Sequence, residues 1–122
     1  MYSAAVLDHF KNPRNAGELP GASATVEVSN PVCGDIMQLA VRFSEDRIAE
    51  ARFKTRGCVT AIACGSLLTE LIRGKTLEEA GRITYVQISD ALGGLPPATV
   101  HGSQLACDAL EAVLAALGQM SH

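Results

Sequence analysis

The feature that most restricts the fold of this chain is a change of hydrophobic period near Gly57. Before that point, apolar and polar residues alternate in three segments, as Val26 and Val28 do in the first of them. The segments are residues 24–30, 35–44 and 47–57. Alternation with period two is typical of strands that bury one face. The short link Ser44-Glu45-Asp46 predicts an antiparallel hairpin between the second and third strands.

After Gly57 the apolar residues recur at helical spacing, which predicts a helix that stops at Gly74. Further helices are expected at residues 3–11, after the capping-box pair Thr76 and Glu79, at residues 85–92, and from a start near Ser103 as N-cap. The economical arrangement is an α+β fold, in which several helices pack on one face of a three-stranded antiparallel sheet. We expect residues 1–122 to form a single domain.

Composition excludes several classes of protein. A chain of 122 residues can bury a core without disulfides, and its net charge of -3 argues against a general nucleic-acid binder. No apolar run has the length of a membrane span, and the first residues lack the basic start and apolar stretch of a signal peptide. The four cysteines are therefore interpreted as reduced cytoplasmic thiols, which favours metal binding or sulfur chemistry.

Residues able to bind metal concentrate in three motifs: NPVCGD (30–35), GCVTAIACGS (57–66) and VHGSQLAC (100–107). Cys33 and Asp35 flank Gly34, in a turn that can direct both side chains to one point. Cys58 and His101 each stand where a helix is expected to open, a position that stabilises a thiolate. Two thiolates, one imidazole and one carboxylate would complete a tetrahedral shell for zinc or iron.

These residues also have structural interpretations. No C-x-x-C pair is present, Asp35 can cap its turn, and His101 can be satisfied by nearby backbone groups. Cys64 and Cys107 lie inside the expected helices, where a free cysteine usually packs as a small apolar side chain. The spacing alone leaves both interpretations open.

Several longer stretches make the chain resemble the IscU/NifU-type iron–sulfur cluster assembly scaffolds. The stretches are DHFKNPRNAG, NPVCGD, ARFKTRGC followed by AIACGSLLTELIRGKTLEEA, and LPPATVHGSQLACDAL. The resemblance implies a scaffold rather than an enzyme. A cysteine desulfurase would deliver sulfur, iron would be added, and a transient [2Fe–2S] cluster would pass to recipient apo-proteins. It also implies that the same site can bind zinc.

The resemblance further implies that Cys33, Asp35, Cys58 and His101 hold the cluster, with the aspartate keeping it labile. A carboxylate oxygen suits that role, because it holds iron less strongly than a thiolate does. The family motif H-C-S reads His101-Gly102-Ser103 here, so the third cysteine of the family is missing.

Cys107 is one candidate to replace that cysteine. Helical side chains tilt toward the N-terminus, so its sulfur would lean toward His101, whereas Leu110 places it at the edge of an apolar stripe. Cys64 follows Cys58 by six residues, as Cys107 follows His101, so the two thiols could face each other across the helix pair. Cys107 can therefore be interpreted either as a replacement metal ligand or as a core residue.

A second departure from the family lies just upstream. The stretch L-P-P-V-K, through which the family contacts its ATP-driven chaperone, reads Leu95-Pro96-Pro97-Ala98-Thr99 here. The missing lysine argues against docking to that chaperone.

Three functions therefore compete. The preferred one is a variant cluster scaffold. The alternatives are a degenerate paralogue that binds zinc or docks on a desulfurase without building clusters, and a redox or sulfur-carrying enzyme that uses Cys58 with Cys64.

Overall fold

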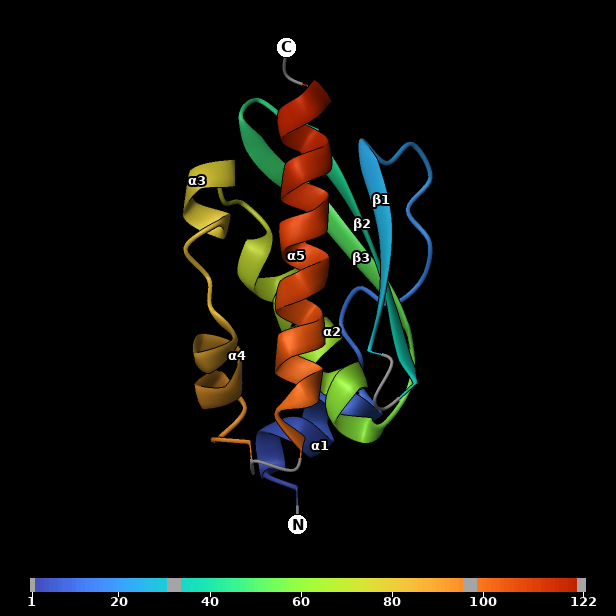
Figure 1. The fold of residues 1–122 in the computed structure, drawn as a ribbon, viewed down its shortest axis with the longest axis vertical. Coiled ribbons are helices and arrows are strands. Elements are labelled where there is room, and N and C mark those ends of the chain that lie inside the picture. The colour runs from blue at the N-terminus through green and yellow to red at the C-terminus, as the bar shows by residue number, and fades with distance from the viewer. Residues whose placement is uncertain (1, 31–33, 96–98, 121–122) are drawn as a thin grey trace.

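The structure is a computed structural model that describes residues 2–30, 34–95 and 99–120. Its strands are β1 (Ala24–Asn30), β2 (Asp35–Ser44) and β3 (Arg47–Arg56), and its helices are α1 (Ala4–Lys11), α2 (Val59–Ile72), α3 (Leu77–Ala80), α4 (Tyr85–Ala91) and α5 (His101–Met120). The strands form one antiparallel sheet in the order β1-β2-β3. The helices lie on one side of that sheet, with α2 and α5 next to it and α3 and α4 outside them (Figure 1). The predicted α+β fold is confirmed.

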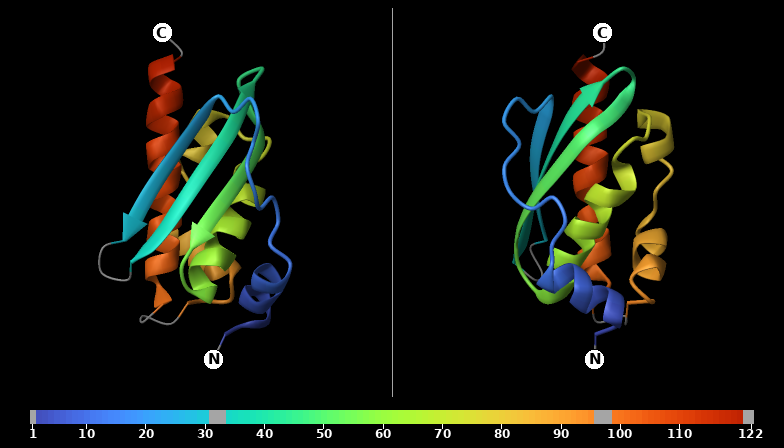
Figure 2. Two further views of the ribbon diagram at one scale, coloured as in Figure 1. Left: turned by 90° about the vertical axis from the view of Figure 1, so that its right-hand side faces the viewer. Right: turned by 180° about the vertical axis from the view of Figure 1, so that it is seen from behind.

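The sheet follows the alternation of the sequence. In β1 the valines are partly buried while the residues between them are exposed, and the opposite face of the sheet carries no helix among the described residues (Figure 2). The β2–β3 hairpin turns at Glu45 and Asp46, whose φ angles are 54° and 64°. Two successive residues with positive φ match the right-handed twist of the paired strands. The predicted hairpin is therefore present.

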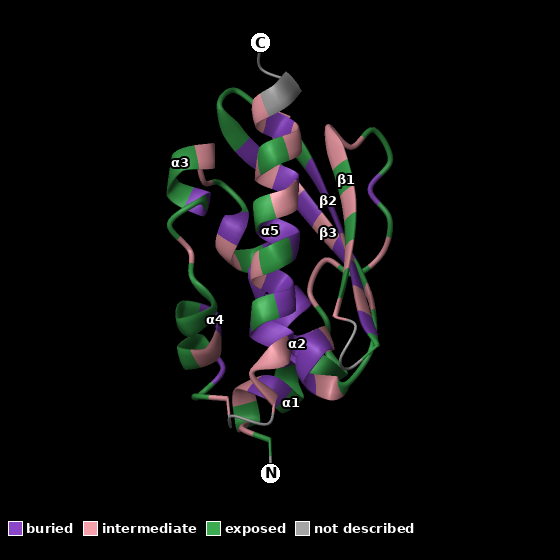
Figure 3. Cartoon of the chain, in the orientation of Figure 1, coloured by how far each residue is buried: buried purple, intermediate pink, exposed green. Residues whose placement is uncertain are grey.

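The core lies between the inner face of the sheet and the pair α2–α5 (Figure 3). Met37 and Leu39 of β2 are fully buried against apolar residues of both helices. Gly65 brings α2 especially close to the sheet, because a Cβ at this residue would lie 2.6 Å from the ring of Phe53. Close packing here fixes the distance between the middle of α2 and the sheet.

The helix starts are set by local signals, with one difference from the expected boundaries. Thr76 and Glu79 form the predicted capping box at α3, and Thr84 caps α4 in the same way. Ser103 is not the N-cap of the last helix, since α5 already begins at His101 and the Ser103 hydroxyl instead donates to the carbonyl of Val100 at 2.7 Å. No helix within the described residues is long and apolar enough to span a membrane.

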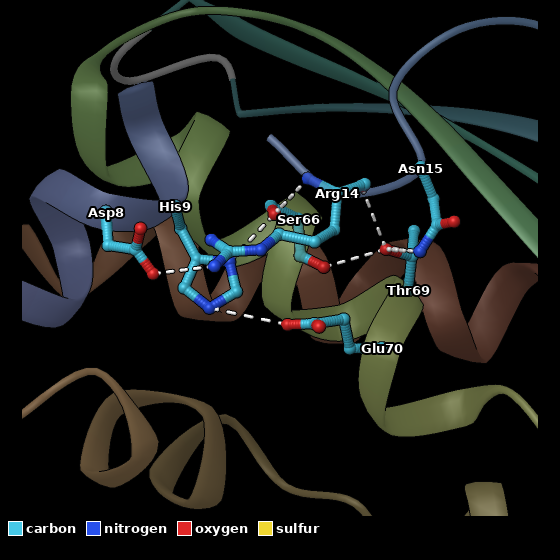
Figure 4. A network of polar contacts seen from close by, with 7 residues as sticks. All are labelled: Asp8, His9, Arg14, Asn15, Ser66, Thr69 and Glu70. Carbon is cyan, nitrogen blue, oxygen red and sulfur yellow. Dashed lines mark hydrogen bonds and ion pairs between the residues drawn. The ribbon is translucent and has the colours of Figure 1, made fainter. Parts of the chain in front are cut away.

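A polar network joins α1 and the loop after it to α2 (Figure 4). The Ser66 hydroxyl lies 2.8 Å from Nδ1 of His9 and accepts the backbone N–H of Arg14, also at 2.8 Å. The hydroxyl of Thr69 donates to the Ser66 carbonyl at 2.7 Å, and Nε2 of His9 lies 3.5 Å from Glu70. Burial lowers the pKa of His9, which favours its neutral form. The network holds α1 and the loop after it against the second half of α2.

Candidate metal centre

Four chain segments converge at one end of the molecule. There β2 begins at Asp35, β3 ends at Arg56, and the helices α2 and α5 open at Val59 and His101. The first turns of both helices lie at the same end as α1 (Figure 1). Residues far apart in the sequence are thereby brought to one place.

A pocket of about 250 Å³ lies at this convergence. Its walls are formed by Tyr2, Asp35, Cys58, Thr60, Thr99, His101 and Gly102. Within it the sulfur of Cys58 lies 3.6 Å from Oδ2 of Asp35. A thiol, a carboxylate and an imidazole, which are three of the four main candidates from the sequence, therefore line one pocket.

The carboxylate of Asp35 is held in a buried position. Its residue is 6% exposed, and its side chain fills the space over the backbone of Gly57. A Cβ at residue 57 would lie only 2.6 Å from Oδ1 of Asp35. The glycine at the β3–α2 junction therefore allows the carboxylate to lie beside Cys58.

Cys58 is the N-cap residue of α2 and is exposed. Its backbone is extended and its side chain makes no capping hydrogen bond, so the sulfur is directed to other partners. The first N–H groups of an α-helix have no acceptor within the helix and carry partial positive charge. The pocket therefore offers negatively charged groups a favourable position.

His101 is the first residue of α5 and is partly buried at the wall of the pocket. The next residue, Gly102, is buried where α5 meets α2. A Cβ there would lie 3.1 Å from the nitrogen of Ala61 and 3.1 Å from Cγ2 of Thr60. The starts of α2 and α5 are thus in contact at Gly102.

The full predicted ligand set is not seen together. Among the residues that the structure describes, no three His, Cys, Asp or Glu side chains lie close enough to share a metal ion. Cys33 belongs to the predicted set and lies outside the described residues. The close pair is Cys58 with Asp35, and the four-residue site stays a prediction.

Cys64 is not part of the pocket. It lies in the middle of α2 within the hydrophobic core and is 0% exposed. Burial, with a smaller contribution from Cys58, raises its pKa to about 12. A protonated and inaccessible thiol is a poor nucleophile and a poor metal ligand. Its surroundings give no support to a redox pair with Cys58.

Cys107 is half-buried on α5, and its sulfur lies 4.0 Å from the carbonyl of Ile83 in the α3–α4 connection. Its pKa is raised, chiefly by burial and next by the carboxylates of Glu111 and Asp108. This thiol does not line the pocket either. The structure therefore brings neither Cys64 nor Cys107 to the candidate site.

Two residues of the pocket had no role in the sequence-based prediction. Tyr2 is 41% exposed and forms part of the wall, a position that only the fold reveals. Thr60 is fully buried in the first turn of α2, and its hydroxyl has no hydrogen-bond partner among the described residues. Its place two residues after Cys58 is the only signal in the sequence that points to it.

The fold and the pocket define an α+β domain that presents sulfur, oxygen and nitrogen donors at one end of its sheet. Residues 1–120 match the NifU-like N terminal domain, and the chain belongs to that family. The resemblance seen in the sequence is confirmed.

Relatives and solved structures agree with this assignment. The chain is 49% identical over 110 residues to the iron-sulfur cluster assembly scaffold protein IscU 1 of Archaeoglobus fulgidus, covering 90% of this chain and 72% of that one. It is 49% identical over 118 residues to IscU of Haemophilus influenzae, covering 93% of each chain. A crystal structure of a putative scaffold protein for the SUF system from Fervidobacterium islandicum superimposes with a TM-score of 0.79 at 25% identity, covering 93% of this chain and 96% of that one.

Proposed function

We propose that this chain is a scaffold for the assembly and transfer of iron–sulfur clusters. The observation that carries the proposal is the pairing of Cys58 with Asp35 at 3.6 Å, in one pocket with His101, in a chain of this family. Relatives with nearly half of their residues identical are named as such scaffolds, which favours a carrier over an enzyme. Cys33 is included in the proposed site on the family resemblance.

The residues of the pocket suit iron and sulfide as cargo. The exposed sulfur of Cys58 lies where α2 begins and is accessible to an incoming iron or sulfur donor. The buried carboxylate of Asp35 contributes a hard oxygen, which binds iron less strongly than a thiolate does. A mixed donor set of this kind holds a cluster and still releases it, as transfer to another protein requires.

A scaffold that carries iron and sulfide needs partners that supply sulfur and partners that accept the cluster. A cysteine desulfurase would supply sulfur and recipient apo-proteins would accept the cluster. Exposed apolar side chains on α1, Leu7 and Phe10, lie toward the end of the molecule that carries the pocket and offer contact area for a partner. Docking to the ATP-driven chaperone is not expected, because the stretch Leu95-Pro96-Pro97-Ala98-Thr99 lacks the lysine of the family motif. Most of that stretch lies outside the described residues. Reduced thiols suit the cytoplasm as the compartment.

Anaerobic reconstitution tests the proposal. The protein is incubated with ferrous iron, cysteine and a cysteine desulfurase, and its visible absorption and its iron and sulfide contents are measured. We expect a brown, oxygen-sensitive [2Fe–2S] protein, loss of the cluster in Cys58→Ala, and retention in the matched variant Cys107→Ala. Zinc binding without any cluster in the wild type would instead establish the alternative, a zinc-binding or desulfurase-docking module.

A further inference from the structure

A groove lies on the face of the sheet that carries no helix among the described residues (Figure 2). Its volume is about 440 Å³, and it is lined by Glu27, Ile36, Gln38, Lys54, Thr55 and Arg56. Glu27 belongs to β1 and Arg56 is the last residue of β3, and both residues are exposed. Pockets that bind small ligands commonly have volumes of about 300–1,000 Å³. The groove is therefore large enough for a small ligand, and it shares no residue with the candidate metal centre.

Two opposite charges in this groove have no ion pair. Every Asp, Glu, Lys and Arg side chain of the chain is among the described ones, and none of them pairs with Glu27 or Arg56. The other charged side chains of the same face are paired: Arg42 and Arg52 with Glu50 at 3.0 Å, and Lys54 with Glu18 at 3.2 Å. The groove thus contains one negative and one positive side chain that no other side chain compensates.

The sheet holds these two residues apart. Glu27 is in register with Gln38, and Gln38 is in register with Lys54, two residues before Arg56. With strands about 4.8 Å apart and a rise of about 3.3 Å per residue, the Cα atoms of Glu27 and Arg56 are about 12 Å apart. Ile36 and Gln38 of β2 lie between them. A ligand that contacts both charges has to cross the central strand.

The signs of the charges decide the class of ligand. A simple anion would be attracted by Arg56 and repelled by Glu27, and a simple cation would meet the opposite problem. A molecule with an ammonium group at one end and a carboxylate at the other is attracted at both ends. An extended peptide spans about 3.3–3.6 Å per residue, so a peptide of about two or three residues bridges the gap that the two long side chains leave. The partly buried Ile36 offers apolar contact to its middle.

We propose that this groove binds a short zwitterionic peptide of about two or three residues. The C-terminal carboxylate of the peptide pairs with Arg56, and its N-terminal ammonium group pairs with Glu27. The amide of Gln38, between the two charges, hydrogen-bonds to the backbone of the peptide. The binding site needs no metal, so it goes beyond the proposed function and does not depend on it.

A peptide series of increasing length tests the proposal. The metal-free, ¹⁵N-labelled protein is titrated with alanine, dialanine and trialanine, and the backbone amide shifts are followed by NMR. We expect saturable shifts at Ile36, Gln38 and Arg56 with dialanine or trialanine, and weaker binding of alanine. Because exposed charge pairs each contribute little, the expected Kd is on the order of 1 mM.

Blocked peptides and single variants show whether both charges take part. N-acetyl-trialanine lacks the ammonium group and trialanine amide lacks the carboxylate, and each should bind at least about threefold more weakly than trialanine. Arg56→Gln and Glu27→Gln should each raise the apparent Kd of trialanine by a similar factor. Arg82→Gln is the matched control, because Arg82 is exposed, pairs with Glu78 and does not line the groove. Its Kd should equal that of the wild type.

Two results would overturn the proposal. If the blocked peptides bind as tightly as trialanine, the charges of Glu27 and Arg56 do not select the ligand. If no peptide of the series causes saturable shifts at the groove, a short peptide is not its ligand. Because the titration is carried out without metal, neither result affects the proposed cluster scaffold, and failure of cluster reconstitution would leave the peptide site standing.

Discussion

The carboxylate of Asp35 occupies the space that a side chain at Gly57 would need. A Cβ at residue 57 would lie 2.6 Å from Oδ1 and 2.7 Å from Cγ of Asp35. The same carboxylate lies 3.6 Å from the sulfur of Cys58 through its other oxygen. The geometry of the thiol–carboxylate pair therefore depends on the absence of a side chain at the junction of β3 and α2.

Gly57→Ala is expected to weaken metal binding. The new methyl group would push the carboxylate of Asp35 from its buried place and separate it from Cys58. Loss of one anionic ligand should lower the affinity for zinc or cobalt(II) at least about tenfold, and overpacking should cost about 1–3 kcal/mol of folding free energy. Competition titration with a metal-binding dye measures the affinity, and urea unfolding measures the stability.

Gly118→Ala is the matched control for this substitution. A Cβ at residue 118 would have nothing within 4 Å, and the residue lies within α5. Alanine should raise the free energy of unfolding by about 0.5–1 kcal/mol and leave metal affinity unchanged. Equal metal affinities for the two alanine variants would show that the position of Asp35 does not depend on Gly57.

The buried imidazole of His9 should make stability depend on pH. Its pKa is lowered, first by burial and then by Arg14, against the opposing effects of Glu70 and Asp8. The unfolded chain therefore binds a proton at a higher pH than the folded protein does, so acid favours unfolding. The contribution is constant above the ordinary pKa of about 6.5, and stability falls as the pH drops below it toward the folded pKa.

Urea unfolding between about pH 7.5 and 5.5 measures this dependence. His9→Asn removes the titrating group, so its free energy of unfolding should decline less over the same range. Ser66→Ala leaves both Nδ1 of His9 and the backbone N–H of Arg14 without their shared partner and should cost about 1–3 kcal/mol at neutral pH. Parallel pH profiles for wild type and His9→Asn would refute the assignment to this histidine.

The turn between β2 and β3 is a place where the chain can be stabilised. Glu45 and Asp46 both have positive φ, which asparagine and glycine tolerate better than these residues do. The double substitution Glu45→Asn with Asp46→Gly is expected to raise the free energy of unfolding by about 1 kcal/mol. Glu45→Val should lower it, because a β-branched residue disfavours this region. Thermal or urea unfolding of the two variants and the wild type measures these changes in stability. If the Glu45→Val variant were the more stable of the two, the turn geometry would be contradicted.

The elements predicted best from the sequence are those fixed by local patterns. The first two strands have the expected bounds, and the capping box of Thr76 and Glu79 is predictable because its two partners lie three residues apart. The pair Thr84 and Gln87 forms an equivalent capping box that the sequence analysis does not predict, although the same spacing indicates it. The start of α5 differs by two residues, because a serine near a helix start can bond to a preceding carbonyl as well as cap.

The site was only partly predictable, because its geometry depends on contacts between distant segments. The spacing of Cys58 and Asp35 left their proximity open, and only the family resemblance implied that they share a site. The direction of Cys107 could not be predicted, since a residue at the edge of an apolar stripe faces whichever element packs there, and here that element is the connection at Ile83. The buried hydroxyl of Thr60 becomes noticeable only when the starts of α2 and α5 are seen in contact.

The cysteines should differ strongly in reactivity. Cys58 is exposed, whereas Cys64 is fully buried and burial raises its pKa to about 12. Because the thiolate is the reactive form, iodoacetamide should label Cys58 rapidly in the native, metal-free protein and Cys64 only after unfolding. Cys107 is half-buried with a raised pKa and should react at an intermediate rate.

Mass spectrometry of peptides after timed alkylation gives the rate for each cysteine separately. Adding zinc should slow labelling of Cys58, since a metal-bound sulfur is protected, and leave the rate at Cys107 unchanged because that thiol is not part of the pocket. Labelling in urea provides the reference at which all thiols react. Protection of Cys107 together with Cys58 on addition of zinc would show that the two thiols share a metal, and would restore Cys107 as the replacement for the family's missing cysteine.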